Sequence, residues 1–264
     1  MNRVREAVDA AWHSKQVWLL QVLVNPVLLV AAALWLNIPE AHVWQLLLSA
    51  IMVLIVALAW VWLQAGSLAY FALAEKERNL REAFAGTLRS LVPFLAWIAL
   101  MVFCLDFVVG WHENTRPMAS YIRSGFSRVM RNHFSQAQAD WLLTSLAWFV
   151  FWILVPGVFL PLAREIARRG VRGFDKVGWM WWFRTVRSGW YWIGVALLSV
   201  LGVYLPQRLI AWLPLMSSYA SEMTSLILRF TAAWLLASAA WTLLLSLLGA
   251  YSRRAPEVSG QPPA

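Results

Sequence analysis

Two charged side chains lie inside long apolar stretches of the sequence, where a charge is costly. Asp106 is the one acid of the stretch 91–110, and Arg229 is the one base of the stretch 223–250. At the centre of a membrane span each would cost roughly 2.5–3.5 kcal/mol on insertion scales. Both fall near the same end of their spans, so an intramembrane ion pair is predicted. A gate, a proton or anion site, and separate snorkelling to the outer surface are the open alternatives.

A second group of polar side chains interrupts the first two apolar stretches. Gln21, Asn25 and Pro26 fall in the first stretch, and Gln64 falls in the second. Proline has no amide N–H and frees a backbone carbonyl, and Asn25 could satisfy the freed polar groups. Asn25, Gln21 and Gln64 are therefore predicted to form a polar site at a helix break. Broken helices line substrate paths in transporters, and a packing kink is the alternative.

Catalytic, cofactor and metal motifs do not accompany these residues. The sequence has no G-x-S-x-G, no H-E-x-x-H, no P-loop and no Rossmann glycine pattern. His42, His112, Glu113 and His133 fall on separate segments without a ligand spacing, so we predict no metal site. We expect no cofactor and no enzymatic activity.

The composition is that of a chain dissolved in lipid. Of its 264 residues 61% are hydrophobic and 13% are charged, and 19 are tryptophan. Soluble domains are about 25% charged, and Trp is favoured at membrane interfaces. The net charge of +9 comes from basic residues that flank apolar stretches and form no nucleic-acid-binding motif. Anionic lipid headgroups are the simpler partner, and nucleic acid is not expected.

The apolar stretches are long enough to cross a membrane. About 20 helical residues cross about 30 Å of hydrocarbon. The first stretch continues past Ala31-Ala32-Ala33, which argues against a cleaved signal peptide. We predict six spans, at about 17–36, 43–73, 91–110, 141–162, 190–213 and 223–250.

Lys and Arg are distributed unequally between the two sides of these spans. Sixteen of them fall on the side of the termini and five on the other side. Because positive charge stays in the cytoplasm, both termini are predicted to be cytoplasmic, in a bacterial-type inner membrane. The predicted transmembrane domain covers 1–251. The tail 252–264 contains three prolines and few apolar residues, and is predicted to be disordered.

The connections show helical spacing of their own. Leu80, Phe84 and Leu88 predict an interfacial helix before the third span, and Phe174, Val177 and Trp181 predict another before the fifth. In the external connection, one amphipathic helix is predicted on the outer leaflet or over the bundle, with partner docking as the alternative. Its apolar face would comprise Ile122, Phe126, Val129, Met130, His133 and Phe134.

A short motif occurs twice. Thr87-Leu88-Arg89-Ser90 precedes the third span, and Thr185-Val186-Arg187-Ser188 precedes the fifth. Spans 2–3 and 4–5 would then form a parallel internal repeat with its axis along the membrane normal. The alternative is convergence, because Thr and Ser cap helices and Arg belongs at cytoplasmic span ends.

The layout resembles bacterial six-span proteins related to the membrane domain of some glycerophosphodiester phosphodiesterases. Ala11-Trp12 and Trp18 at the start of the first span carry this resemblance. So do two similar sets, Gly66, Phe84 and Arg89-Ser90, then Gly157, Phe174 and Arg187-Ser188. The resemblance implies a fold and no catalytic residues, since the phosphodiesterase domain has no counterpart in this sequence.

The sequence therefore predicts an all-α integral membrane protein with six transmembrane helices and amphipathic interfacial helices. Its predicted function is that of a non-enzymatic component that binds membrane lipids or a membrane protein partner, which could be a second copy of the chain. The alternative is a transporter of a small molecule or lipid.

Overall fold

The computed structural model describes residues 2–38, 42–73, 77–212 and 218–252. These residues are almost entirely helical, and none of them lies in a strand. Six helical segments are long and apolar enough to cross a membrane, and each overlaps one predicted span. Their bounds are Lys15–Trp35, Val43–Ala72, Leu80–Glu113, Gln136–Phe174, Gly189–Ala211 and Tyr219–Tyr251. The predicted tail from residue 253 onward lies outside the described residues.

The chain divides into two compact units. One contains 1–95 and 161–264, and the other contains 96–160. Both boundaries fall inside helices, namely α5 (Leu91–Glu113) and α9 (Val155–Arg169). The single transmembrane domain predicted from the sequence is thus organised as two packed bodies, which are described separately below.

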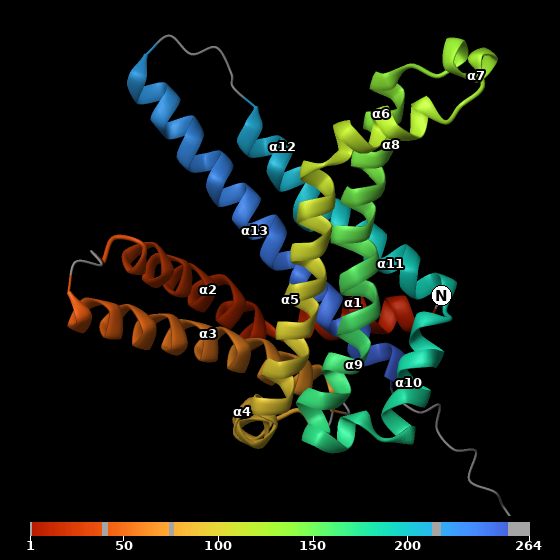
Figure 1. The fold of residues 1–264 in the computed structure, drawn as a ribbon. Coiled ribbons are helices and arrows are strands. Elements are labelled where there is room, and N and C mark those ends of the chain that lie inside the picture. The colour runs from red at the N-terminus through yellow and green to blue at the C-terminus, as the bar shows by residue number, and fades with distance from the viewer. Residues whose placement is uncertain (1, 39–41, 74–76, 213–217, 253–264) are drawn as a thin grey trace, which may run out of the picture. The chain divides into compact units, whose positions relative to one another are not determined.

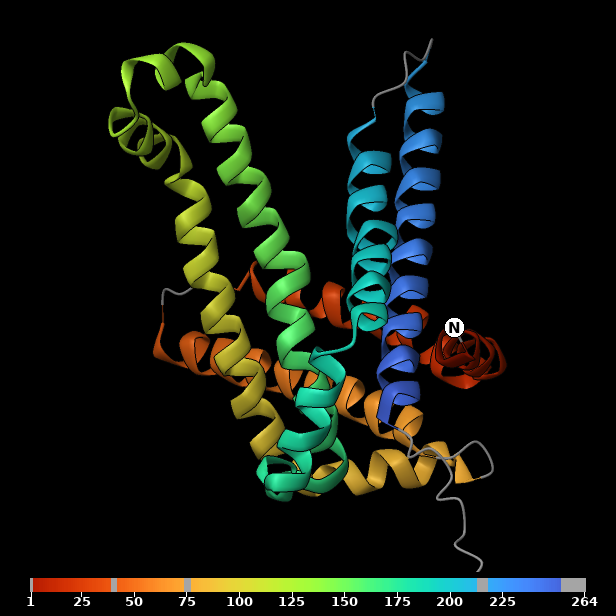
Figure 2. The ribbon, with the colours of Figure 1, turned by 90° about the vertical axis from the view of Figure 1, so that its right-hand side faces the viewer.

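The larger unit is built around the last helix, α13 (Tyr219–Ser252). It contacts α1 (Asn2–His13), α2 (Lys15–Trp35), α3 (Val43–Ala72) and α11 (Gly189–Ser199). It also runs beside α12 (Leu205–Ala211), and α2 and α3 form a hairpin (Figures 1 and 2).

Small residues let these helices approach one another near the end of α3. From Leu63 to Ala72 every residue of α3 is buried, and Ala65, Gly66 and Ser67 are the small ones at its centre. A Cβ on Gly66 would lie 2.6 Å from the ring of Phe84, so only glycine leaves room for that ring. Close approach through small side chains is the usual means of packing helices in lipid, where the hydrophobic effect between them is absent.

Short helices precede three of the spans, and two of them, before the third and fifth spans, were predicted from the connections. They are α1, α4 (Leu80–Thr87) and α10 (Lys176–Val186). α4 continues through the 3₁₀ turn Leu88–Ser90 into α5, and α10 leads into α11. Both copies of the T-x-R-S motif therefore occupy the same kind of junction. Duplication itself stays a prediction.

The junction before α2 is built in the same way, although its sequence differs. Ser14 separates α1 from α2, is buried, and donates a hydrogen bond to the Ala10 carbonyl at 2.6 Å. Ser90 is also buried and donates to the Thr87 and Ala167 carbonyls. The junctions before α2 and α5 thus share a buried serine that donates to a helix carbonyl, whereas Ser188 before α11 is half-buried and makes no capping hydrogen bond.

Asp175 begins α10 after the 3₁₀ turn Gly170–Phe174. Its carboxylate accepts a hydrogen bond from the Gly178 N–H at 2.8 Å and pairs with Arg169. These contacts, the Gly178 hydrogen bond first, hold the pKa of Asp175 below its ordinary value. The helix start therefore depends on a charged carboxylate.

Two spans contain a single π-helical turn, and each turn ends two residues before a proline. Val150–Leu154 precedes Pro156, and Val200–Tyr204 precedes Pro206. Proline lacks an N–H and its ring clashes with the carbonyl four residues earlier. A wider turn relieves both problems without ending the helix.

The smaller unit contains the connection between the third and fourth spans, which is not the single helix predicted. It folds as α6 (Thr115–Ser124) and α7 (Arg128–His133), followed by α8 (Gln136–Phe149). The chain turns at Gly125-Phe126, and the Ser127 side chain caps α7. Phe126 and Phe134 thus lie outside both helices, with ring centroids 5.9 Å apart. The turn between the two helices was missed.

Candidate functional site

The predicted polar residues of the first two spans meet in the larger unit. Gln21 Nε2 donates to Ser67 Oγ at 2.9 Å and lies 3.4 Å from Gln64 Oε1. Asn25 Nδ2 donates to the Gln21 Oε1 at 2.7 Å and to the Gln21 carbonyl at 2.9 Å. Gln21, Gln64 and Ser67 are all buried. The three residues predicted as a polar site at a helix break therefore form one hydrogen-bonded network.

Pro26 does free a carbonyl, but Asn25 is not the residue that satisfies it. The carbonyl four residues before Pro26 is that of Val22, and it accepts a hydrogen bond from Trp234 Nε1 of α13 at 3.2 Å. The proline is thus compensated by a tertiary contact. Sequence reasoning missed this residue because the donor lies more than two hundred positions away.

Trp241 makes the matching contact to the other helix of the hairpin. Its Nε1 donates to Gln64 Oε1 at 2.7 Å. Trp234 and Trp241 are seven residues apart, two helical turns, so they project from one face of α13. Together they tie α13 to α2 and to α3. The seven-residue spacing of two tryptophans is a signal that the sequence does contain.

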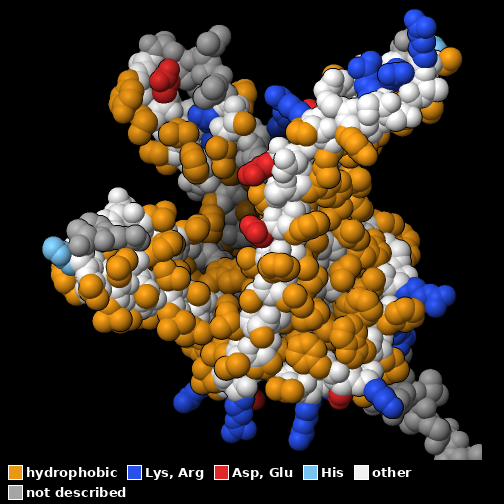
Figure 3. Space-filling model, in the orientation of Figure 1, with side chains coloured by type: hydrophobic (Ala, Val, Ile, Leu, Met, Phe, Trp, Pro, Cys, Tyr) orange, Lys and Arg blue, Asp and Glu red, His pale blue; other side chains and the backbone are white. Residues whose placement is uncertain are grey.

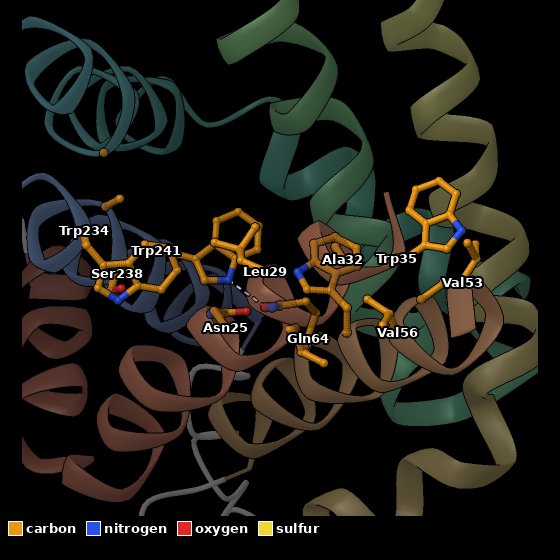
Figure 4. Close-up of a pocket in the computed structure, with 15 residues that line it drawn as sticks. Asn25, Leu29, Ala32, Trp35, Val53, Val56, Gln64, Trp234, Ser238 and Trp241 are labelled. Carbon is orange, nitrogen blue, oxygen red and sulfur yellow. Dashed lines mark hydrogen bonds between the residues drawn. The ribbon is translucent and has the colours of Figure 1, made fainter. Parts of the chain in front are cut away.

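A cavity of about 590 Å³ opens beside this network, between α2, α3, α13 and the π turn of Val200–Tyr204 (Figure 4). Most of its lining is apolar, and Trp35, Trp60, Trp234 and Trp241 contribute the largest side chains. Figure 4 shows the amides of Asn25 and Gln64 near the Trp241 indole. The other lining residues are Leu28, Leu29, Ala32, Val53, Val56, Ala57, Gly202, Ala237 and Ser238.

Two polar atoms remain available to a ligand in this cavity. The donors around Gln64 Oε1 and the acceptors around Asn25 Nδ2 fix the orientation of both amides. Within the described part of the chain, Gln64 Nε2 and Asn25 Oδ1 have no hydrogen-bond partner. One is a donor and the other an acceptor. The cavity thus offers one hydrogen-bonding pair in otherwise apolar surroundings.

Helix irregularities border the cavity on two sides. Pro26 follows Asn25 in α2, and Gly202 lies in the π turn. A Cβ on Gly202 would lie 2.7 Å from the Ala240 Cβ of α13. Glycine thus permits the π turn to lie against α13 at the cavity wall. Single π turns in helices occur frequently at functional sites.

The predicted pair of intramembrane charges is distributed over the two units. Arg229 is buried in the larger unit, where Nε donates to the Ser225 carbonyl at 3.2 Å and Nη1 to the Ile210 carbonyl at 3.3 Å. Ile210 belongs to α12, so Arg229 fastens α12 to α13. Asp106 lies in α5 within the smaller unit and is exposed. Their ion pair stays a prediction.

Another buried ion pair was not recognised from the sequence. Arg164 and Glu165 of α9 are both buried, and Arg164 Nη1 lies 2.7 Å from Glu165 Oε1. Adjacent opposite charges just past a predicted span end are common among residues that flank a span, so the sequence pattern does not single them out. Packing of the helix end inside the unit buries them instead.

Among the described residues, no three or more His, Cys, Asp or Glu side chains lie close enough together to hold a metal ion. Comparisons with protein-family models, with curated proteins and with solved structures give no match. The cavity and its amides are therefore the main basis for a functional interpretation.

Proposed function

We propose that this protein is a non-enzymatic membrane component that binds a neutral lipid in the cavity between α2, α3 and α13. The observation that carries the proposal is a largely apolar cavity of about 590 Å³ with a few converging polar groups. Small-molecule sites have this composition and a volume of about 300–1,000 Å³.

The depth of the amides favours an uncharged ligand. Asn25 lies ten residues after Lys15, where α2 begins. At about 1.5 Å per residue this is about 15 Å along the span, near the centre of the hydrocarbon. A charged headgroup is costly there, whereas a carbonyl or hydroxyl group can bond Gln64 Nε2 and Asn25 Oδ1.

The same amides provide the selectivity. Apolar cavity walls give little advantage over lipid tails, because both are hydrocarbon. A ligand that satisfies a buried amide gains over one that does not. The ligand class is thus an apolar chain or ring that carries a neutral hydrogen-bonding group.

Native mass spectrometry of the protein with neutral lipids tests this proposal. Ala57→Trp fills the cavity and should abolish binding of a long-chain alcohol or quinone. Leu54→Trp is the matched control, because Leu54 lies on the same helix, is 55% exposed and does not line the cavity. Equal binding by the two variants would refute the site.

Transport of such a lipid is the second candidate. One wall contains the π turn at Gly202, and another belongs to α2, which stays one continuous helix through Pro26. Transporters build binding sites at helix breaks. Transfer of a fluorescent neutral lipid between the leaflets of proteoliposomes would distinguish transport from binding alone.

For the membrane and its orientation, the proposal is a bacterial-type cytoplasmic membrane with both termini inside. Exposed basic side chains support it, since they gather at the end of the larger unit where α4 and α10 lie, along the lower edge of Figure 3. Reporter fusions at residue 125 and at the C-terminus test it, and a cytoplasmic signal from residue 125 would overturn it.

A further inference from the structure

A second hollow lies on the other side of the α2–α3 hairpin, where α4 packs. It has a volume of about 1,030 Å³, and all of its lining residues belong to the larger unit. Its lining is divided by chemistry. The polar side chains are Gln16, Glu77, Arg78, Asn79, Arg81 and Glu82, and the apolar ones include Leu20, Val24, Trp62, Leu63 and Phe84. We call this hollow the α4 groove.

The polar and apolar parts of the α4 groove lie at different depths. Gln16 is in the first turn of α2, and the charged residues follow the end of α3. Val24 lies eight residues further along α2, about 12 Å deeper at about 1.5 Å per residue. A polar mouth at the span ends thus leads to an apolar wall along the spans, which is the polarity of a phospholipid.

The wall of the α4 groove is fixed in place by specific contacts. Trp62 and Phe84 meet edge to face with centroids 5.4 Å apart, and Trp62 Nε1 donates to the Phe84 carbonyl at 3.0 Å. The Phe84 ring lies over Gly66. At the mouth, Asn79 caps α4 by accepting from the Arg81 N–H at 3.1 Å, and its Nδ2 donates to Glu82 Oε1 at 3.1 Å. The groove is therefore largely pre-formed.

Among the described residues that line the mouth, the charges are balanced, with two arginines and two glutamates. Glu77, Arg81 and Glu82 are exposed, and Arg78 lies over the rings of Tyr70 and Phe71. A purely basic mouth would favour an anionic headgroup. In this mouth the two carboxylates would repel such a headgroup. A zwitterionic headgroup places its phosphate at the arginines and its ammonium at the glutamates.

We propose that the α4 groove binds a phospholipid with a phosphoethanolamine headgroup. A primary ammonium donates hydrogen bonds to carboxylates, and a trimethylammonium group cannot. The phosphate faces Arg81 and Arg78, the ammonium faces Glu77 and Glu82, and one acyl chain follows Leu20, Val24 and Trp62. This site is separate from the neutral-lipid cavity, so either proposal can fail alone.

Lipid titration in native mass spectrometry tests the headgroup. The protein in mild detergent is titrated with phosphatidylethanolamine, phosphatidylcholine and phosphatidylglycerol of identical chains. Phosphatidylethanolamine should bind about five- to tenfold more tightly than the other two lipids, because each of them lacks one charge-assisted hydrogen bond to a carboxylate. Equal binding of phosphatidylcholine, or tighter binding of phosphatidylglycerol, overturns the assignment.

Matched arginine variants locate the site. Arg81→Gln removes a charge from the groove mouth, and Arg89→Gln removes an exposed charge nearby that does not line the groove. Arg81→Gln should weaken phosphatidylethanolamine binding about fivefold, and Arg89→Gln should leave it unchanged. Equal effects of the two variants overturn the site. Ala57→Trp, which fills the other cavity, serves to separate the two proposals because it should not affect this binding.

Discussion

Trp234 and Pro26 should be energetically coupled, because the indole N–H replaces the backbone donor that proline lacks. Trp234→Phe keeps the ring and leaves the Val22 carbonyl without its donor. A hydrogen bond in a membrane protein contributes on average about 0.6 kcal/mol and at most about 1.7 kcal/mol. An orphaned buried polar group costs about 1–3 kcal/mol. We therefore expect Trp234→Phe to destabilise the protein by about 1–2 kcal/mol.

Pro26→Ala supplies an N–H at residue 26 that can bond the same carbonyl. In that background the hydrogen-bond part of the Trp234→Phe cost should vanish, and the part due to lost ring volume should remain. A double-mutant cycle from reversible unfolding in mixed detergent micelles measures the difference, expected to be about 0.6–1.5 kcal/mol.

Trp241→Phe provides the control for this cycle. It removes a hydrogen bond of the same kind, but to Gln64 in α3 rather than to Val22. Its cost should be the same in the native chain and in the Pro26→Ala background. Additivity of Trp234→Phe with Pro26→Ala within about 0.3 kcal/mol would refute the compensation argument.

Three further outcomes are expected. Gly66→Val places a side chain where the Phe84 ring lies, so it should destabilise the protein by about 1–3 kcal/mol and detach α4 from α3. Limited proteolysis between residues 77 and 90 would detect the detached helix. Asp175→Asn should lower the thermal stability at pH 7, because the lowered pKa of Asp175 makes its charged form stabilising. This difference should disappear as the pH falls below about 4, through the lowered pKa, and a pH-independent difference would contradict it. Gly202→Val should weaken neutral-lipid binding by displacing the π turn from α13, and unchanged binding would show that the turn does not shape the cavity.

Much of the secondary structure could be predicted from the sequence because long apolar runs have few alternatives in lipid. The second span was predicted over 43–73, and α3 covers Val43–Ala72. The fourth was predicted to begin at 141, and α8 begins five residues earlier at Gln136. The Ser135 and Gln138 side chains form a capping box there, a pattern that is readable in the sequence and was overlooked.

The candidate site could be predicted in part. Gln21, Asn25 and Gln64 were recognised because amides are rare in apolar stretches and costly unless they are paired. The roles of Trp234 and Trp241 were missed, since they are two of 19 tryptophans and their seven-residue spacing does not show which groups they bond. Their hydrogen bonds depend on which face of α13 meets the hairpin.

The sequence by itself determined that this is a helical membrane protein with six spans, and that Lys and Arg are concentrated at the span ends on one side. Apolar length and flanking charge are local properties, and the bilayer imposes the same solution on each run independently. Only the tertiary structure decided that the amides of α2 and α3 share one network, that α13 supplies the donor for the carbonyl freed by Pro26, and that a cavity and a groove lie on opposite sides of the hairpin. These features depend on how small residues such as Gly66 and Gly202 let helices approach, which is a relation between distant segments.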